Sequence, residues 1–119
     1  MESFWLNSNT FPQYDRLKGN HKTGVLIIGG GITGILCAYR LHKQNIPYIL
    51  VEADRICNGI TKNTTAKITS QHGLIYNKIS QMYGTSKAAL YLKANEYALS
   101  EYKHLCNTID CDYETKDSY

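Results

Sequence analysis

The chain has 119 residues, 43% of them hydrophobic, which allows one modest domain with a buried core and excludes both two domains and disorder throughout. Its 13 basic residues are scattered among 10 acidic ones, for a formal net charge of +3, so nucleic-acid binding has no support from composition. No apolar run approaches the roughly 20 residues of a membrane span, and the first residues do not resemble a signal peptide, so a cytoplasmic protein is expected.

Residues 1–23 predict an irregular amino-terminal arm. Turn-forming residues alternate there with aromatic side chains, without the period of a helix or a strand. Because aromatic side chains are poorly suited to a free tail in water, we expect the arm to pack on another surface, which can include sequence absent from this chain. The aromatic residues of the arm are Phe4, Trp5, Phe11 and Tyr14.

A strand, a helix and a second strand follow the arm. Residues 24–29 form a continuous apolar run bounded by glycines, which predicts a strand buried on both faces, as in a parallel sheet. Residues 32–45 have the apolar spacing of a helix with cationic side chains near its end. Pro47 cannot continue that helix, and residues 48–51 predict a second buried strand. The two strands should be parallel and joined by a right-handed crossover.

The rest of the chain predicts a loop and two helices. Residues 53–71 are rich in Thr, Asn and Lys and predict mainly a loop. A short helix is expected over residues 74–83, ending near Gly84, and a long amphipathic helix over residues 86–108. The spacing places six residues on one face of the long helix: Ala88, Leu92, Leu99, Tyr102, Cys106 and Ile109.

The cysteines predict neither a metal site nor disulfides. They form no C-x-x-C pair and have no histidine at metal-ligand spacing. We expect small packed side chains with reduced thiols, since a disulfide framework would require secretion. The four cysteines are Cys37, Cys57, Cys106 and Cys111.

Gly29, Gly31 and Gly34 form the pattern G-x-G-x-x-G, which by itself is weak support for a nucleotide site. Its surroundings strengthen it, because the first glycine ends a predicted strand and the third lies in the opening turn of a predicted helix. Glu52 closes the next strand, 23 positions after Gly29, close to the roughly 20 expected of a carboxylate that binds a ribose.

Each member of this pattern has a physical role at a dinucleotide. Gly29 permits the tight turn, Gly31 lets a pyrophosphate approach the backbone, and Gly34 lets the helix lie close to the sheet. The amides at the helix start bind phosphates, and Glu52 accepts hydrogen bonds from ribose hydroxyls while repelling the extra phosphate of NADP. FAD or NAD is therefore predicted. The alternative is that the glycines only shape an ordinary turn and that Glu52 is a solvated strand end.

Residues 25–56, VLIIGGGITGILCAYRLHKQNIPYILVEADRI, resemble the FAD fingerprint of the D-amino acid oxidase-like flavoproteins, which include glycine, sarcosine and gamma-glutamylputrescine oxidases. The following GITKNTTAKITSQHGLIY resembles a bacterial branch of FAD-dependent oxidoreductases, some with a C-terminal Rieske domain. The arm and the end of the chain also resemble that branch. The resemblance implies an α/β fold: a partial Rossmann-like FAD-binding domain with a βαβ unit of parallel strands, then a loop and a long helix.

The resemblance implies that Gly29, Gly31 and Gly34 meet the FAD pyrophosphate, that Glu52 meets the adenosine ribose, and that residues 59–67 run toward the flavin. It implies further cofactor contacts at Ile32, Thr33, Ala53, Arg55, Thr64, Thr65 and Lys67.

Two residues beyond the phosphate site have alternative interpretations. The charge of Lys67 would favour hydride acceptance by the flavin, and the alternative is a solvated loop lysine. His72 is expected to be a hydrogen-bonded structural histidine, with a place beside the flavin as the alternative. No catalytic residue is assigned.

The chain departs from that branch at several positions. Gly24 stands where the branch usually has an acidic residue, Asn45 where it has a glycine, and Cys57 where it has a small residue. Asn45 can still adopt the left-handed conformation of a helix end. Residues 60–62 read Ile-Thr-Lys where the branch has a Thr-Gly pair. The larger side chains of Ile60 and Lys62 are expected to crowd the loop that runs along the cofactor.

Residues 24–119 are expected to be a truncated amino-terminal part of an FAD/NAD(P)-binding domain, because two strands cannot enclose FAD. The chain lacks the C-x-H and C-x-x-H pair of a Rieske site. The resemblance implies oxidation of a small amine or amino acid in the full-length protein, with the chain alone inactive and associating with the missing remainder. The alternatives are a fragment of an NAD-linked reductase and a truncated, non-catalytic subunit.

Overall fold

The computed structural model describes residues 10–117, which divide into one compact unit ending at Thr65 and a second beginning at Ala66. Residues 10–23 of the expected arm contain no helix or strand, and Phe4 and Trp5 lie outside the described residues. Tyr14 is 77% exposed. No described part of the chain covers this side chain, so the expected packing of the arm stays a prediction.

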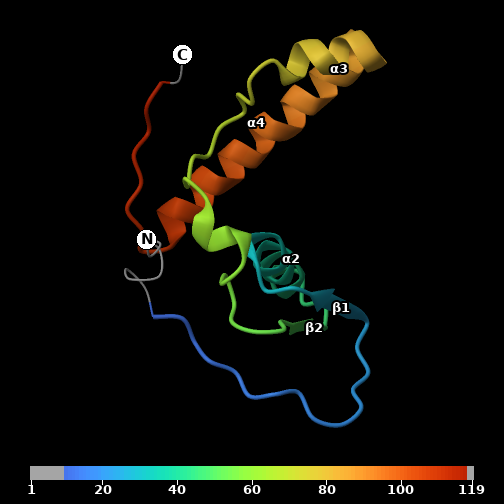
Figure 1. The fold of residues 1–119 in the computed structure, drawn as a ribbon, viewed down its shortest axis with the longest axis vertical. Coiled ribbons are helices and arrows are strands. Elements are labelled where there is room, and N and C mark those ends of the chain that lie inside the picture. The colour runs from blue at the N-terminus through green and yellow to red at the C-terminus, as the bar shows by residue number, and fades with distance from the viewer. Residues whose placement is uncertain (1–9, 118–119) are drawn as a thin grey trace. The chain divides into compact units, whose positions relative to one another are not determined.

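The first unit is a strand, helix, strand unit built from β1 (Val25–Ile28), α2 (Ile32–Lys43) and β2 (Tyr48–Val51). The two strands pair in parallel, beginning with Val25 opposite Tyr48, and form a two-stranded sheet in the described part of the chain. Figure 1 shows α2 lying against this sheet. The predicted βαβ unit with parallel strands is confirmed.

The carboxyl end of α2 is encoded by the residues next to it. The amide of Asn45 donates to the His42 carbonyl at 3.0 Å, and the amide of Ile46 donates to the Leu41 carbonyl at 2.9 Å. Asn45 has a φ of 56°, the left-handed conformation expected at this helix end. Pro47, without an amide hydrogen, follows at once and starts the chain toward β2.

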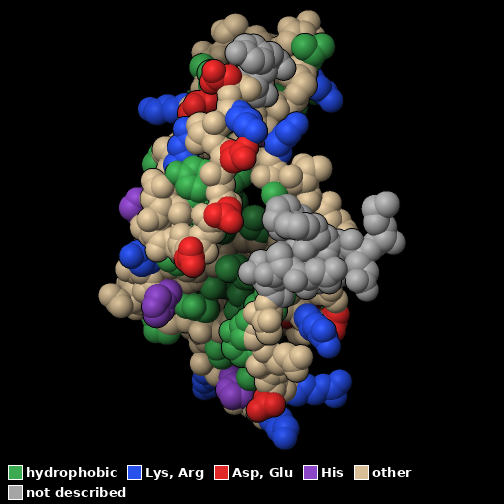
Figure 2. Space-filling view, turned by 90° about the vertical axis from the view of Figure 1, so that its left-hand side faces the viewer, with side chains coloured by type: hydrophobic (Ala, Val, Ile, Leu, Met, Phe, Trp, Pro, Cys, Tyr) green, Lys and Arg blue, Asp and Glu red, His purple; other side chains and the backbone are tan. Residues whose placement is uncertain are grey.

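The prediction that β1 is buried on both faces is wrong. Ile27 is buried and faces α2, whose Ala38 is also buried, but Leu26 is 55% and Ile28 81% exposed. Alternate side chains of a strand point to opposite faces, and among residues 10–117 no element covers the second face. Figure 2 shows hydrophobic side chains on one face of the molecule.

The second unit is a helical hairpin of α3 (Ile75–Tyr83) and α4 (Thr85–Thr108). Gly84 joins the helices with a φ of 85°, a conformation that glycine adopts at little cost. The two helices run side by side in Figure 1, and the rings of Tyr76 and Tyr91 meet edge to face with centroids 5.8 Å apart. Both helices were predicted to within one residue at their starts and ends.

The apolar face predicted for α4 is only partly covered. Four of its members are half-buried, whereas Leu92 is 43% and Ile109 58% exposed. Neither α3 nor α4 contains a fully buried residue. None of the helices described has the length and apolar character needed to cross a membrane. The half-buried members are Ala88, Leu99, Tyr102 and Cys106.

The four cysteines are free thiols, as predicted, but they are not all packed. Cys57 and Cys106 are half-buried, whereas Cys37 and Cys111 are exposed, so the packed environment predicted for the latter two is wrong. Cys37 precedes the buried Ala38 by one position, and one position corresponds to about 100° around a helix. Its side chain is therefore turned away from the sheet.

Candidate functional site

The glycine turn connects β1 to α2 and matches the geometry that its spacing predicts. Gly29 has a φ of 105°, and its amide donates to the Val51 carbonyl at 2.8 Å, so the turn starts at the carboxyl edge of the sheet. A Cβ on Gly34 would lie 2.0 Å from the carbonyl oxygen of Gly29. No side chain fits there, so the third glycine is required for the helix to approach the turn.

Glu52 lies at this turn, beyond the end of β2. One carboxylate oxygen accepts a hydrogen bond from the Gly30 amide at 2.6 Å. The other accepts from the amides of Ala53 at 2.8 Å and Asp54 at 3.2 Å. These amides, that of Gly30 first, hold the pKa of the exposed Glu52 carboxyl below its ordinary value. The carboxylate is therefore charged at neutral pH and oriented by the backbone.

A second side chain reaches the turn from the following loop. The hydroxyl oxygen of Thr61, in the short 3-10 helix η1 (Ile60–Asn63), accepts a hydrogen bond from the Ile32 amide at 3.0 Å. It also lies 3.3 Å from the position that a Cβ on Gly31 would occupy. Gly31 is the residue before α2 and has no side chain with which to cap the helix. Thr61 supplies that cap from 29 positions along the chain.

Residues 52–61, which we call the strap, therefore lie over the glycine turn. Besides the Glu52 and Thr61 contacts, the Cys57 amide donates to the Gly30 carbonyl at 2.9 Å. A Cβ on Gly30 would lie 2.9 Å from a methyl group of Ile56. Cys57 itself has a φ of 59°, which only glycine adopts freely, and partial burial raises the pKa of its thiol.

The structure brings some of the sequence-predicted residues together and not others. Gly29, Gly31, Gly34 and Glu52 meet at the turn, and the loop 53–71, predicted as mainly irregular, contains η1. The Thr64 hydroxyl donates to the Thr61 carbonyl at 3.2 Å. The exposed members of the predicted set are Ile32, Thr33, Ala53, Arg55, Thr64, Thr65 and Lys67.

Lys67 and His72 belong to the second unit, whereas the glycine turn belongs to the first. His72 is exposed, and residues 10–117 provide it with no hydrogen-bond partner. The expected structural role of His72 is therefore not found. The charge of Lys67 faces solvent in a loop, where both interpretations of it remain predictions.

Thr61 was missed by reasoning from the sequence. The sequence did contain a signal, because the helix start after Gly31 lacks a capping side chain and the loop predicted to follow the cofactor contains several hydroxyl residues. Spacing alone could not choose among Thr61, Thr64 and Thr65. The choice depends on the turn of η1, which directs Thr61 toward the Ile32 amide.

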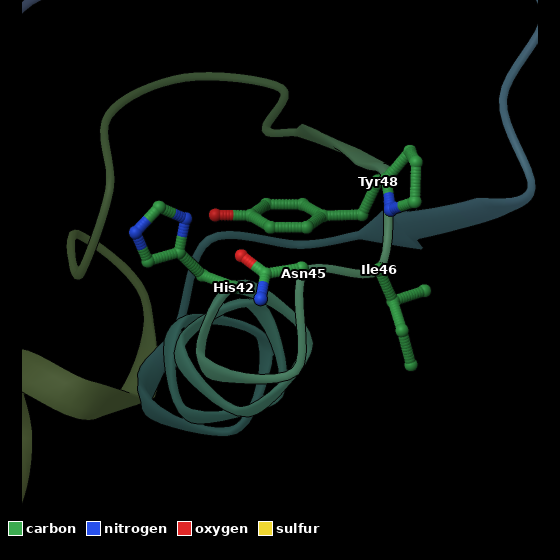
Figure 3. A pocket seen from close by; sticks show the side chains of 5 residues that line it. His42, Asn45, Ile46 and Tyr48 are labelled. Carbon is green, nitrogen blue, oxygen red and sulfur yellow. The ribbon is translucent and has the colours of Figure 1, made fainter.

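A hollow of about 410 Å³ lies at the other end of α2 and is wide open to solvent. Figure 3 shows His42, Asn45, Ile46 and Tyr48 around it, at the carboxyl end of the helix. It contains none of the residues predicted to bind a cofactor and none that contact the glycine turn. The contacts of Glu52 and Thr61 with the glycine turn lie at the amino end of α2, away from this hollow.

The glycine turn fits a dinucleotide on two observations. The first backbone hydrogen bond of α2 runs from the Ile35 amide to the Gly31 carbonyl, so the amides of Thr33 and Gly34 have no acceptor one turn back and favour an anion, whereas that of Ile32 donates to Thr61. The Glu52 carboxylate beside them is an acceptor for hydroxyl groups. Hydrogen-bond donors for a phosphate and an acceptor for a ribose therefore lie close together in space. Binding sites for FAD and NAD share this arrangement.

Comparisons with known proteins agree with this geometry. The family described as "FAD dependent oxidoreductase" (DAO) matches residues 24–119. A Bacillus subtilis protein named as a Rieske 2Fe-2S iron-sulfur protein, YhfW, is 39% identical over 99% of the chain and 24% of its own length. The mitochondrial glycerol-3-phosphate dehydrogenase of Saccharomyces cerevisiae is 38% identical over 79% of the chain and 14% of its own length.

A third curated relative, the gamma-glutamylputrescine oxidoreductase of Escherichia coli, is 24% identical over 90% of the chain and 26% of its own length. No solved structure matches the chain significantly. The chain spans between 14% and 26% of the length of these curated relatives.

Proposed function

The chain belongs to the FAD-dependent oxidoreductase family DAO, and from this premise we propose that residues 24–119 are the amino-terminal part of its FAD-binding domain, preceded by an arm over residues 1–23. Because the chain spans about a quarter or less of its curated relatives, the complete reaction is assigned to a longer protein. In this proposal the chain contributes cofactor binding and contains no substrate site.

The observation that carries the proposal is the contact between the Glu52 carboxylate and the Gly30 amide at 2.6 Å. It fixes a charged acceptor beside the amides that begin α2, so that a ribose and a diphosphate can be bound by neighbouring groups. In the proposed roles, the amides after Gly31 bind the diphosphate, and Glu52 accepts hydrogen bonds from the adenosine ribose. The same carboxylate disfavours a ribose that carries a phosphate.

For the complete protein we propose oxidation of an amine or amino acid. The similarity to a relative named gamma-glutamylputrescine oxidoreductase supports this substrate class. When bound, FAD supplies an acceptor for the hydride on the carbon next to nitrogen, and the resulting substrate imine hydrolyses. The residues of this chain contribute by holding the adenosine diphosphate half of FAD, away from the reacting carbon.

The binding test uses FAD, ADP, NAD and NADP with the purified chain, followed by calorimetry. We expect binding of FAD and ADP, and weakening by roughly tenfold or more in Glu52→Gln, which removes a charge-assisted hydrogen bond. The matched control is Glu114→Gln, which removes an exposed carboxylate that pairs with Lys116. Equal affinity of Glu52→Gln and the unchanged chain would reject the role of Glu52, and preference for NAD over FAD would favour the reductase alternative.

The substrate test uses the reading frame continued past Tyr119. We expect anaerobic bleaching of the flavin by an amine or amino acid and not by glycerol 3-phosphate, which serves as the comparison because of the yeast relative. The 119-residue chain alone should bleach with neither. Turnover by the chain alone would overturn the proposal that it lacks a substrate site, and bleaching by glycerol 3-phosphate alone would overturn the amine assignment.

A further inference from the structure

Two of the four cysteines lie together at the carboxyl end of α4. Cys106 belongs to the last turn of the helix and is half-buried, whereas Cys111 follows the helix and is exposed. The Cys111 thiol donates to the Cys106 backbone carbonyl, with the sulfur 3.7 Å from the oxygen. That carbonyl is one of the last four of α4, which have no amide one turn ahead within the helix. The contact therefore brings the sulfur of Cys111 back to residue 106.

The segment after α4 folds back over the last helical turn. The chain bends at residues 109 and 110, and the Ile109 amide donates to the Leu105 carbonyl at 3.0 Å. The Tyr113 hydroxyl donates to the side-chain oxygen of Asn107 at 2.7 Å. Cys111 lies between these two contacts along the chain, so the backbone on both sides of it is held close to the helix end.

The side chains of the two cysteines also interact with each other. Desolvation and a hydrogen bond with the Cys106 side chain raise the pKa of the Cys111 thiol. The charges of Asp110 and Asp112, on either side of it in sequence, raise that pKa further. Cys111 is therefore a protonated thiol at neutral pH, which makes it a slow nucleophile and argues against a catalytic role. Its exposure and its neighbouring thiol remain, and both favour a slower chemistry, the formation of a disulfide.

We propose that Cys106 and Cys111 are a reversible redox pair, which a low-molecular-weight disulfide converts into an intramolecular disulfide that fastens residues 109–113 to the end of α4. The pair is independent of cofactor binding, because it lies in the second unit, whereas the glycine turn lies in the first. In the reduced chain the same residues are held to the helix by hydrogen bonds alone.

The oxidation takes place in two exchange steps. The exposed Cys111 thiol loses its proton and attacks one sulfur of the small disulfide, whose S–S bond breaks and releases one small thiolate. Cys106 then loses its proton and attacks the Cys111 sulfur of the mixed disulfide, which releases the second small thiolate. The two released thiolates take up the two protons. The protein thus loses two electrons and two protons, and the small disulfide is reduced to two thiols.

The other cysteines provide a comparison within the same chain. Cys37 is exposed on α2, and Cys57 is half-buried in the strap. Among residues 10–117, neither of these thiols is hydrogen-bonded to a second cysteine. Cys37 should therefore stop at the mixed disulfide, because no second thiol is held beside it.

The test incubates the chain with oxidised and reduced glutathione, blocks the remaining thiols by alkylation and identifies the products by mass spectrometry of peptides. We expect a Cys106–Cys111 disulfide within the monomer, and only the glutathione adduct at Cys37. Cys106→Ser should increase the glutathione adduct on Cys111 by roughly tenfold or more, since no second thiol displaces it. Cys37→Ser is the matched control, because it removes an exposed thiol of the first unit and should leave the Cys106–Cys111 disulfide unchanged.

The same titration in urea separates the effect of the fold from closeness in sequence. We expect the equilibrium constant for closure of the disulfide to fall by roughly tenfold when α4 is unfolded. An equal constant in the folded and unfolded chain would overturn the proposal, because the fold would then contribute nothing to the pair.

Two further outcomes would also overturn the proposal. One is a stable glutathione adduct on Cys111 of the unchanged chain with Cys106 still reduced. The other is a loss of helical circular dichroism when the disulfide closes, because the two thiols are proposed to meet without unwinding α4. Should Cys106→Ser itself unfold, Cys111→Ser provides the second variant: it should leave Cys106 as a single thiol, and a disulfide between Cys106 and any other cysteine would contradict the assignment.

Discussion

The two ends of α2 are built in different ways. At the carboxyl end, the His42 and Leu41 carbonyls accept from residues only three to five positions away. At the amino end, the acceptors for Gly30 and Ile32 come from Glu52 and Thr61, 22 and 29 positions away. The locally built end terminates a helix. The end assembled from distant segments brings charged and hydroxyl groups together, and it is the end where a ligand can be bound.

The largest effect of a substitution is expected at Gly34, at the amino end of α2. Gly34→Ala would place a Cβ 2.0 Å from the Gly29 carbonyl oxygen, so either the turn or the helix must move. We expect a loss of about 3 kcal/mol or more in the free energy of unfolding, together with loss of ADP binding. Gly24→Ala is the control, because its Cβ would meet no atom closer than the Pro47 carbonyl oxygen at 3.9 Å and its φ is not in the left-handed region. Chemical denaturation measures both, and equal stability of the two variants would contradict the geometry of the turn.

Features that depend on neighbouring residues could be predicted from the sequence, whereas features that depend on distant segments could not. Local signals located β1, α2, β2, α3 and α4, because apolar spacing, Pro47 and Gly84 act over a few residues. The left-handed conformation of Asn45 was expected for the same reason. Exposure of Leu26 and Ile28 could not be predicted, since a continuous apolar run indicates which surfaces suit burial and not whether this chain covers them.

Most residues of the glycine turn could be predicted from the sequence, but their contacts with the strap could not. The spacing of Gly29, Gly31, Gly34 and Glu52 correctly placed a carboxylate at the glycine turn. The role of Thr61 depends on the path of the strap, which no periodicity encodes, and only the folded arrangement brings it to Ile32. The cofactor roles of the remaining loop residues stay predictions.

The charge of Glu52 gives the next largest effect, and it depends on pH. Because the folded state lowers the pKa of Glu52, its contribution to stability is present above the ordinary pKa and is lost as the pH falls through the lowered value. Glu52→Gln should therefore flatten the acid limb of a plot of stability against pH and weaken ADP binding at neutral pH. Thermal unfolding from neutral to acidic pH is the measurement. An unchanged acid limb would show that the amides of the turn do not stabilise the charge.

The smallest effect is expected at the locally built end. Asn45→Ala places a residue with a full Cβ in the left-handed conformation, at a cost of about 1 kcal/mol in the free energy of unfolding, whereas Asn45→Gly should be neutral or slightly stabilising. Neither variant should change the affinity for ADP measured under folded conditions. A loss of affinity in Asn45→Gly would mean that the two ends of α2 are coupled, and the contrast between them would fail.

The central claim is that a dinucleotide binds at the amino end of α2, and amide resonances followed during titration with ADP test it directly. The account predicts that the amides of Gly30 and Ile32 shift most, since they now donate to Glu52 and Thr61, while those of Asn45 and Ile46 stay unchanged. Shifts confined to the carboxyl end of the helix, around the hollow of His42 and Tyr48, would contradict it.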